Sequence, residues 1–190
     1  MLIFIGNGPY RRSGKRIDFS AFLSVFKGIQ FRKAAFGYFG HMWELYAFWA
    51  FVPVMLQTYS VHHPKVDFNI PLLSFLIIAL GGVGCVLGGY LSHSLGTKKV
   101  ATTALLLSAL CCLVSPIFFM IPSETVFVSF LFFWGMVVIA DSPLFSTMIA
   151  HNAPIALKGT ALTIVNCIGF AITIVSIQLL TVLQPLAHPI

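Results

Sequence analysis

His41 and Glu44 are the residues best suited to chemistry, because a basic ring and a carboxyl group lie three positions apart within a long apolar stretch. Residues at that spacing share a face of a helix. A carboxylate inside a membrane costs several kcal/mol unless it is paired, protonated or in contact with water. The pair therefore predicts a site that binds a polar substrate or passes a proton. The alternative is that Glu44 is held protonated, or hydrogen-bonded to a neighbouring helix, and only fixes packing.

Two aromatic residues, Tyr38 and Trp43, flank this pair in the sequence. Rings with polar edges suit a substrate cavity, and they equally suit helix packing or the membrane interface. We assign Tyr38 and Trp43, together with His41 and Glu44, to a predicted substrate and proton pathway.

Asp141 is the second acid within an apolar segment, and it directly precedes Ser142 and Pro143. A proline removes one hydrogen bond from a helix and opens its backbone. We expect the Asp141 carboxylate either to cap that break or to act in gating, by pairing with Lys158 or another cytoplasmic base. Pro143 belongs to the same predicted gating set.

The remaining residues predict no metal and no cofactor. The cysteines lie deep in apolar segments without a metal-binding or CxxC spacing, which is typical of reduced packing residues; they are Cys85, Cys111, Cys112 and Cys167. Motifs of metalloproteases, hydrolases and nucleotide-binding proteins are missing from the sequence. A membrane enzyme using His41, Glu44 and His151 is an alternative, although helix rise places His151 about half a bilayer from Glu44.

The composition indicates a membrane protein, because 58% of the residues are hydrophobic and only 8% are charged. A soluble domain has roughly a quarter of its residues charged. The net charge of +6 does not indicate a nucleic-acid partner, since the basic residues lie between apolar runs instead of along one face. The expected surroundings are a lipid bilayer.

Five segments are long enough to cross a bilayer, which takes about 20 apolar residues in a helix. The predicted fold is an all-α, polytopic transmembrane helical bundle. Residues 1–33 are expected to form a cytoplasmic leader with an amphipathic helix, in which Asp18 caps a stripe of Phe19, Phe22, Leu23 and Phe26. The bundle takes residues 34–190, with spans at about 34–59, 70–92, 100–120, 125–149 and 160–183.

The basic residues alternate in a way that orients these spans. On one side lies only Lys65, beside Asp67, and the other side carries all the rest. Because cytoplasmic loops are enriched in Lys and Arg, the N-terminus is predicted to be cytoplasmic and the C-terminus external. The residues on the cytoplasmic side are Arg11, Arg12, Lys15, Arg16, Lys27, Arg32, Lys33, Lys98, Lys99 and Lys158.

Residues 88–99, with the sequence GGYLSHSLGTKK, resemble the G-x-x-x-D-R-x-G-R-R loop of the major facilitator superfamily. Gly89, Gly96 and Lys98 are in register with that motif. His93 stands where the family has an acid, and Ser94 stands where it has a base, which puts a charge-relay latch at this loop in doubt.

Two further stretches are similar to the same family. Residues 154–160, PIALKGT, resemble the P-x-x-x-R-G-T loop between its tenth and eleventh helices, with Lys158 in place of Arg. Residues 37–46, GYFGHMWELY, are similar to the seventh helix of a bacterial subgroup, whose tenth helix also has a turn like Asp141 to Pro143. The resemblance implies helices seven to eleven of a twelve-helix architecture, in a bacterial inner membrane.

The resemblance implies a secondary transporter for a small solute, in which two six-helix bundles rock about a midplane site. We expect proton coupling through Glu44 and gating through Asp141, Pro143, Gly89, His93, Gly96, Lys98 and Lys158. The first six helices and the twelfth have no counterpart. The chain is therefore expected to be a fragment of a longer protein, or else to need a partner that supplies the other bundle. An inert fragment or an assembly subunit is the remaining alternative.

Overall fold

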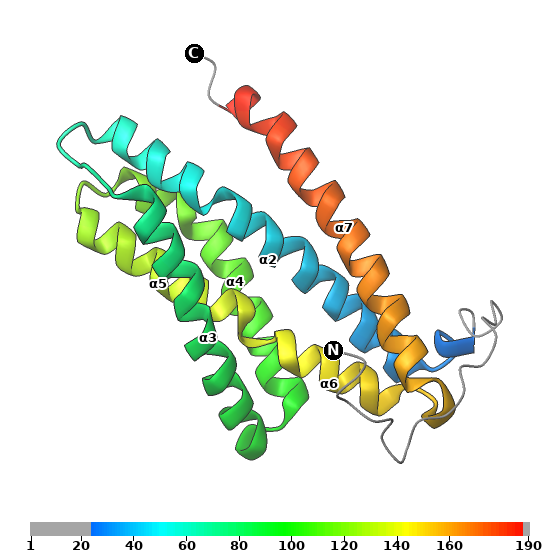
Figure 1. Cartoon of the computed structure of the whole chain (residues 1–190). Coiled ribbons are helices and arrows are strands. Elements are labelled where there is room, and N and C mark those ends of the chain that lie inside the picture. The colour runs from blue at the N-terminus through cyan, green and yellow to red at the C-terminus, as the bar shows by residue number, and fades with distance from the viewer. Residues whose placement is uncertain (1–23, 188–190) are drawn as a thin grey trace, which may run out of the picture.

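The computed structural model describes residues 24–187, with side chains through residue 184, and all regular structure in that part of the chain is helical (Figure 1). The predicted all-α class is therefore confirmed. The long helices are α2 (Ile29–His62), α3 (Ile70–Leu95), α4 (Thr97–Met120), α5 (Glu124–Ala140), α6 (Ser142–Asn152) and α7 (Lys158–Ala187), with a short 3-10 turn η1 (Ile155–Leu157) before α7.

Four helical stretches are long and apolar enough to cross a membrane: Ile70–Leu95, Thr97–Met120, Glu124–Asn152 and Ile155–Gln184. Each corresponds to a predicted span. α2 is longer still, with 34 residues, but it does not reach the same hydropathy. Its glycines, its two histidines and its glutamate lower the mean hydropathy of the helix. That α2 crosses the bilayer stays a prediction.

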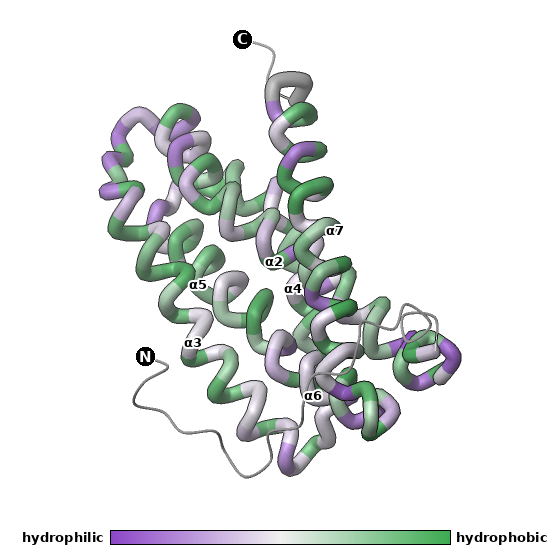
Figure 2. The backbone as a smooth tube through the Cα atoms, turned by 45° about the vertical axis from the view of Figure 1, so that its right-hand side comes forward, coloured by the Kyte–Doolittle hydropathy of each residue, from purple (hydrophilic) through white to green (hydrophobic). Residues whose placement is uncertain are grey.

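α2, α3, α4, the α5–α6 pair and α7 run alternately up and down, so that alternate connections gather at opposite ends of the bundle (Figure 1). Local residues set these turns. The side chain of Asn69 accepts a hydrogen bond from the Leu72 amide and caps α3, while Gly96, with φ of 90°, ends α3 and begins α4. Figure 2 shows polar residues concentrated at the two ends and apolar residues between them.

Glycines allow α3 and α5 to pack backbone against backbone. A side chain at Gly84 would meet the main chain of Met136, and one at Gly88 would meet the carbonyl of Ala140. From the other side, a side chain at Gly135 would meet the carbonyl of Ile77. The Gly84-x-x-x-Gly88 spacing is typical of helices that approach one another this closely in membranes.

The predicted fourth span is divided into α5 and α6 at Asp141, as the following proline predicts. Pro143 lies in the first turn of α6 and has no N–H to offer the carbonyl of Ile139, four residues earlier. The thiol of Cys85, on α3, donates to that carbonyl at 3.4 Å. The prediction that the Asp141 side chain caps the break was wrong, since it makes no capping hydrogen bond.

Most of the predicted amphipathic helix lies outside the described residues, including Asp18, Phe19, Phe22 and Leu23. Phe26 is described, and its ring lies edge-on to Phe31 with centroids 5.3 Å apart. The first described residues thus pack against the start of α2.

Candidate functional site: a polar layer inside the helical bundle

Two separate apolar clusters fill the bundle, and a layer of polar side chains lies at their boundary, formed by His41, Glu44, Ser108, Trp134 and Asp141. One cluster includes Met42 and Leu144 and lies nearer the basic end of the bundle, which carries Lys33, Lys98 and Lys158. The other cluster includes Leu45 and Val138. Along α2 the boundary falls at His41 to Glu44, and along α5 and α6 it falls at Asp141. Because apolar side chains cannot satisfy polar groups, the residues of this layer must satisfy one another.

His41 and Asp141 form the centre of the layer. The Nδ1 atom of His41 lies 2.8 Å from Oδ1 of Asp141, and each side chain is only 1% exposed. The contact has the distance of an ion pair but not the alignment of a hydrogen bond, so neither side chain has a hydrogen-bond partner among the described residues.

This pairing corrects two predictions. His41 pairs with Asp141 and not with Glu44, and Asp141 pairs with His41 and not with Lys158, which is exposed at the start of α7. The reason is helical geometry. Side chains three residues apart are still separated by about 60° around the axis, so His41 faces α6 while Glu44 faces α4.

Glu44 belongs to a second hydrogen-bonded group that joins three helices. The hydroxyl of Ser108, on α4, donates to Oε1 of Glu44 at 2.6 Å, and the indole N–H of Trp134, on α5, donates to the same hydroxyl at 3.1 Å. Glu44 lies three residues after His41 on α2, so the two groups are neighbours within the layer.

The two predicted aromatic residues have different surroundings. Tyr38 is buried, donates from its hydroxyl to Oδ1 of Asn166 at 2.9 Å, and has its ring centroid 6.1 Å from that of His41. Trp43 is 38% exposed, and only its backbone carbonyl is tied to α7, by the hydroxyl of Ser176 at 3.0 Å. Tyr38 adjoins the polar layer, whereas Trp43 lies on another face of α2.

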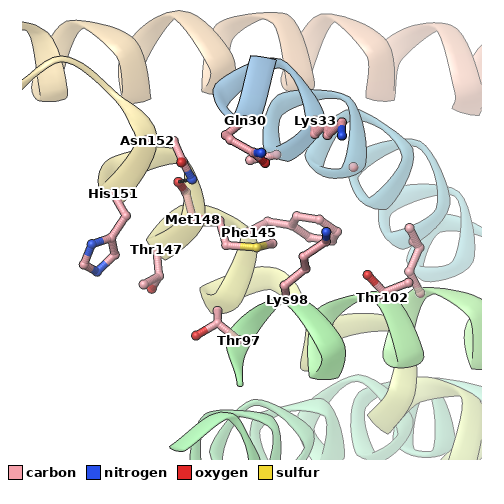
Figure 3. Close-up of a pocket in the computed structure, with 13 residues that line it drawn as sticks. Gln30, Lys33, Thr97, Lys98, Thr102, Phe145, Thr147, Met148, His151 and Asn152 are labelled. Atoms are coloured by element: carbon pink, nitrogen blue, oxygen red, sulfur yellow. Dashed lines mark hydrogen bonds between the residues drawn. The ribbon is translucent and has the colours of Figure 1, made fainter. Parts of the chain in front are cut away.

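The other predicted gating residues lie at the basic end, away from the layer. Gly89 has no close neighbour, His93 and Lys158 are exposed, and Gly96 forms the turn between α3 and α4. Lys98 lines a pocket of about 400 Å³ between α2, α4 and α6, facing residues of α2 that include Lys33 (Figure 3).

Ser108 and Trp134 were not predicted as residues of the site. A single serine in an apolar helix usually bonds to its own backbone, as Ser115 does with Cys112 at 2.9 Å. Asn166, on α7, accepts the hydrogen bond from Tyr38 on α2 and so joins these two helices. Among the described residues, no group of three His, Cys, Asp or Glu is placed to hold a metal, and His151 lines the pocket at the basic end instead of joining His41.

Comparison with known proteins gives one match. The model of the family described as Major Facilitator Superfamily matches residues 3–177. No curated protein and no solved structure gave a match. The matched range includes every residue of the polar layer.

Proposed function

Since this chain belongs to the Major Facilitator Superfamily, a family of membrane transporters, we propose that it forms part of a secondary transporter that moves a small polar or organic solute by alternating access. The second six-helix bundle is supplied either by the same longer chain or by a partner. The basic end faces the cytoplasm, so the N-terminus is cytoplasmic and the protein resides in a plasma membrane, that of a bacterium by the family resemblance.

The His41 and Asp141 pair is the observation that carries a proton-coupled mechanism. With one proton shared between them the pair has no net charge, whether the proton is on the ring or on the carboxyl group. Removing that proton leaves a single buried negative charge, which costs several kcal/mol away from water. The proton therefore leaves only when water or a positively charged group reaches the site, which is the condition that couples proton movement to solute movement.

Glu44 is the residue that we assign to the solute. It is only partly buried, and Ser108 and Trp134 fix its position from two other helices. A carboxyl group held in this way can accept hydrogen bonds from a hydroxyl or an amine. Because Glu44 lies only three residues from His41 on α2, a solute bound at Glu44 lies next to the pair whose protonation it is proposed to control.

The test uses the transporter with both bundles, reconstituted into liposomes with a pH-sensitive dye inside. A panel of sugars, amino acids and organic acids is screened for solute-driven proton movement. We expect Asp141→Asn and His41→Gln to abolish proton movement while solute exchange continues, and Glu44→Gln to weaken both.

Glu124→Gln is the matched control, because Glu124 is an exposed acid at the start of α5. It should leave both activities unchanged. Proton movement that persists in both the Asp141 and the His41 variants would remove the pair from the mechanism.

A further inference from the structure

The pocket at the basic end has the chemistry of an anion site. It measures about 400 Å³, within the size range of small-ligand sites. Lys33, in the first turns of α2, and Lys98, in the first turn of α4, bring two ammonium groups to it from facing helices. Figure 3 shows Lys98 extending from α4 toward Phe145, with Gln30 and Lys33 on the helix opposite.

Neutral polar groups complete the lining, and the lining has no carboxylate. Hydroxyl and amide side chains come from all three helices, namely Gln30, Thr97, Thr102, Thr147 and Asn152. Asn152 already donates to the Met148 carbonyl at 2.8 Å, so its amide is held in place. Two positive charges without an acidic partner in the lining favour an occupant with several negatively charged oxygens.

The floor of the pocket is apolar and connects it to the polar layer. Phe145 is buried beneath the polar groups, and its ring centroid lies 6.0 Å from that of His41. A side chain at Gly37 would collide with the same ring. A ligand in contact with Phe145 would therefore contact α6, the helix that begins directly after Asp141.

We propose that this pocket binds a phosphate-bearing anion, supplied either by the headgroup of an anionic lipid or by a soluble phosphate ester, and that the bound anion ties α6 to α2 and α4. Basic pockets between helices at the cytoplasmic side are suited to anionic headgroups. The pocket is a separate site from the solute site, which lies deeper in the bundle.

The experiment compares two double variants of the full chain in detergent micelles. Lys33→Gln with Lys98→Gln removes both charges from the pocket. Arg32→Gln with Lys99→Gln removes the same charge from the neighbouring positions, which are exposed and do not line the pocket. Size-exclusion profiles check that both variants remain folded.

Three probes are titrated against thermal unfolding: phosphatidylglycerol, inorganic phosphate, and phosphatidylcholine as a lipid without net charge. We expect saturable stabilisation by phosphatidylglycerol or by phosphate, whichever is the source, and none by phosphatidylcholine. Loss of the two pocket lysines should weaken binding about thirty-fold, and loss of the two neighbouring charges should change it by less than about two-fold.

Equal weakening in both double variants would show general attraction to a basic surface and would overturn the proposal. So would the lack of saturable stabilisation by either anionic probe. Both outcomes leave the solute site untested, because neither double variant alters His41, Glu44 or Asp141.

Discussion

His41 and Asp141 lie 2.8 Å apart, with each side chain 1% exposed, and their contact joins the middle of α2 to the junction between α5 and α6. Neither residue has another polar partner in the described part of the chain. Each therefore depends on the other as its polar partner inside the bundle.

Removing one member of this pair should destabilise the protein by about 3 kcal/mol, because the other is left buried without a partner. We expect this loss for His41→Gln and for Asp141→Asn, measured by denaturant titration in micelles with tryptophan fluorescence. The variant with both changes should lose less than the sum of the two, by about 1–3 kcal/mol.

The control for this cycle is Asp67→Asn, in an exposed connection, which should change stability by less than about 0.5 kcal/mol. Strict additivity of the two single losses would mean that the residues do not interact.

Ser108→Ala should cost about 1–3 kcal/mol, since it removes the hydroxyl that donates to Glu44 and accepts from Trp134. The change also leaves the indole N–H of Trp134 without its partner, so the emission of that tryptophan should shift in wavelength. Ser115→Ala is matched in helix and residue type, but Ser115 is only partly buried and its hydroxyl bonds within α4. Equal effects of the two substitutions would contradict the bridging role of Ser108.

Gly84→Ala should destabilise the chain by about 1–3 kcal/mol, because the added methyl group meets the backbone of Met136. Gly82→Ala, two positions away in the same helix, meets nothing within 4 Å and should be neutral or slightly stabilising. Thermal unfolding of the two variants side by side makes the comparison. If Gly84→Ala were as stable as Gly82→Ala, α3 and α5 would not pack as closely as described.

Cysteines placed at Lys98 and Lys65 should react with a membrane-impermeant maleimide from opposite sides of intact vesicles. The expectation follows from the up-and-down order of the helices and from the excess of basic residues at one end. The background is a variant without Cys85, Cys111, Cys112 and Cys167. Labelling of both positions from the same side would exclude the proposed topology.

The helices were largely predictable from the sequence, and the contacts of the site were not. Apolar runs of bilayer length and the breaks at Gly96 and Pro143 determine where helices begin and end, so the predicted spans fall within the observed helices and the α5–α6 pair. Partner choice depends on how each helix is rotated about its axis. A rotation of about 60° separates a His41 that faces Glu44 from one that faces Asp141, and no periodicity in α2 resolves that difference.

For Glu44 and Asp141, too, the need for a partner could be predicted from the sequence, but the partner itself could not. Their cost of burial identified Glu44 and Asp141 as residues that need partners, and this reasoning uses only their positions in apolar segments. Ser108 was not identified because its hydroxyl could equally have bonded to its own helix, as the hydroxyl of Ser115 does. Only the packing of α4 against α2 and α5 decides between the two.

The missing backbone donor at Pro143 gives α6 a mechanical role. The junction lacks the usual bond from residue 143 to the carbonyl of Ile139, which instead accepts from the backbone N–H of Asp141 and from the thiol of Cys85 on α3. α6 is thus a short lever of 11 residues with its pivot beside Asp141. If the two proposals above hold, a small tilt of this lever would change both the spacing of His41 and Asp141 and, through Phe145, the width of the pocket lined by Lys33 and Lys98.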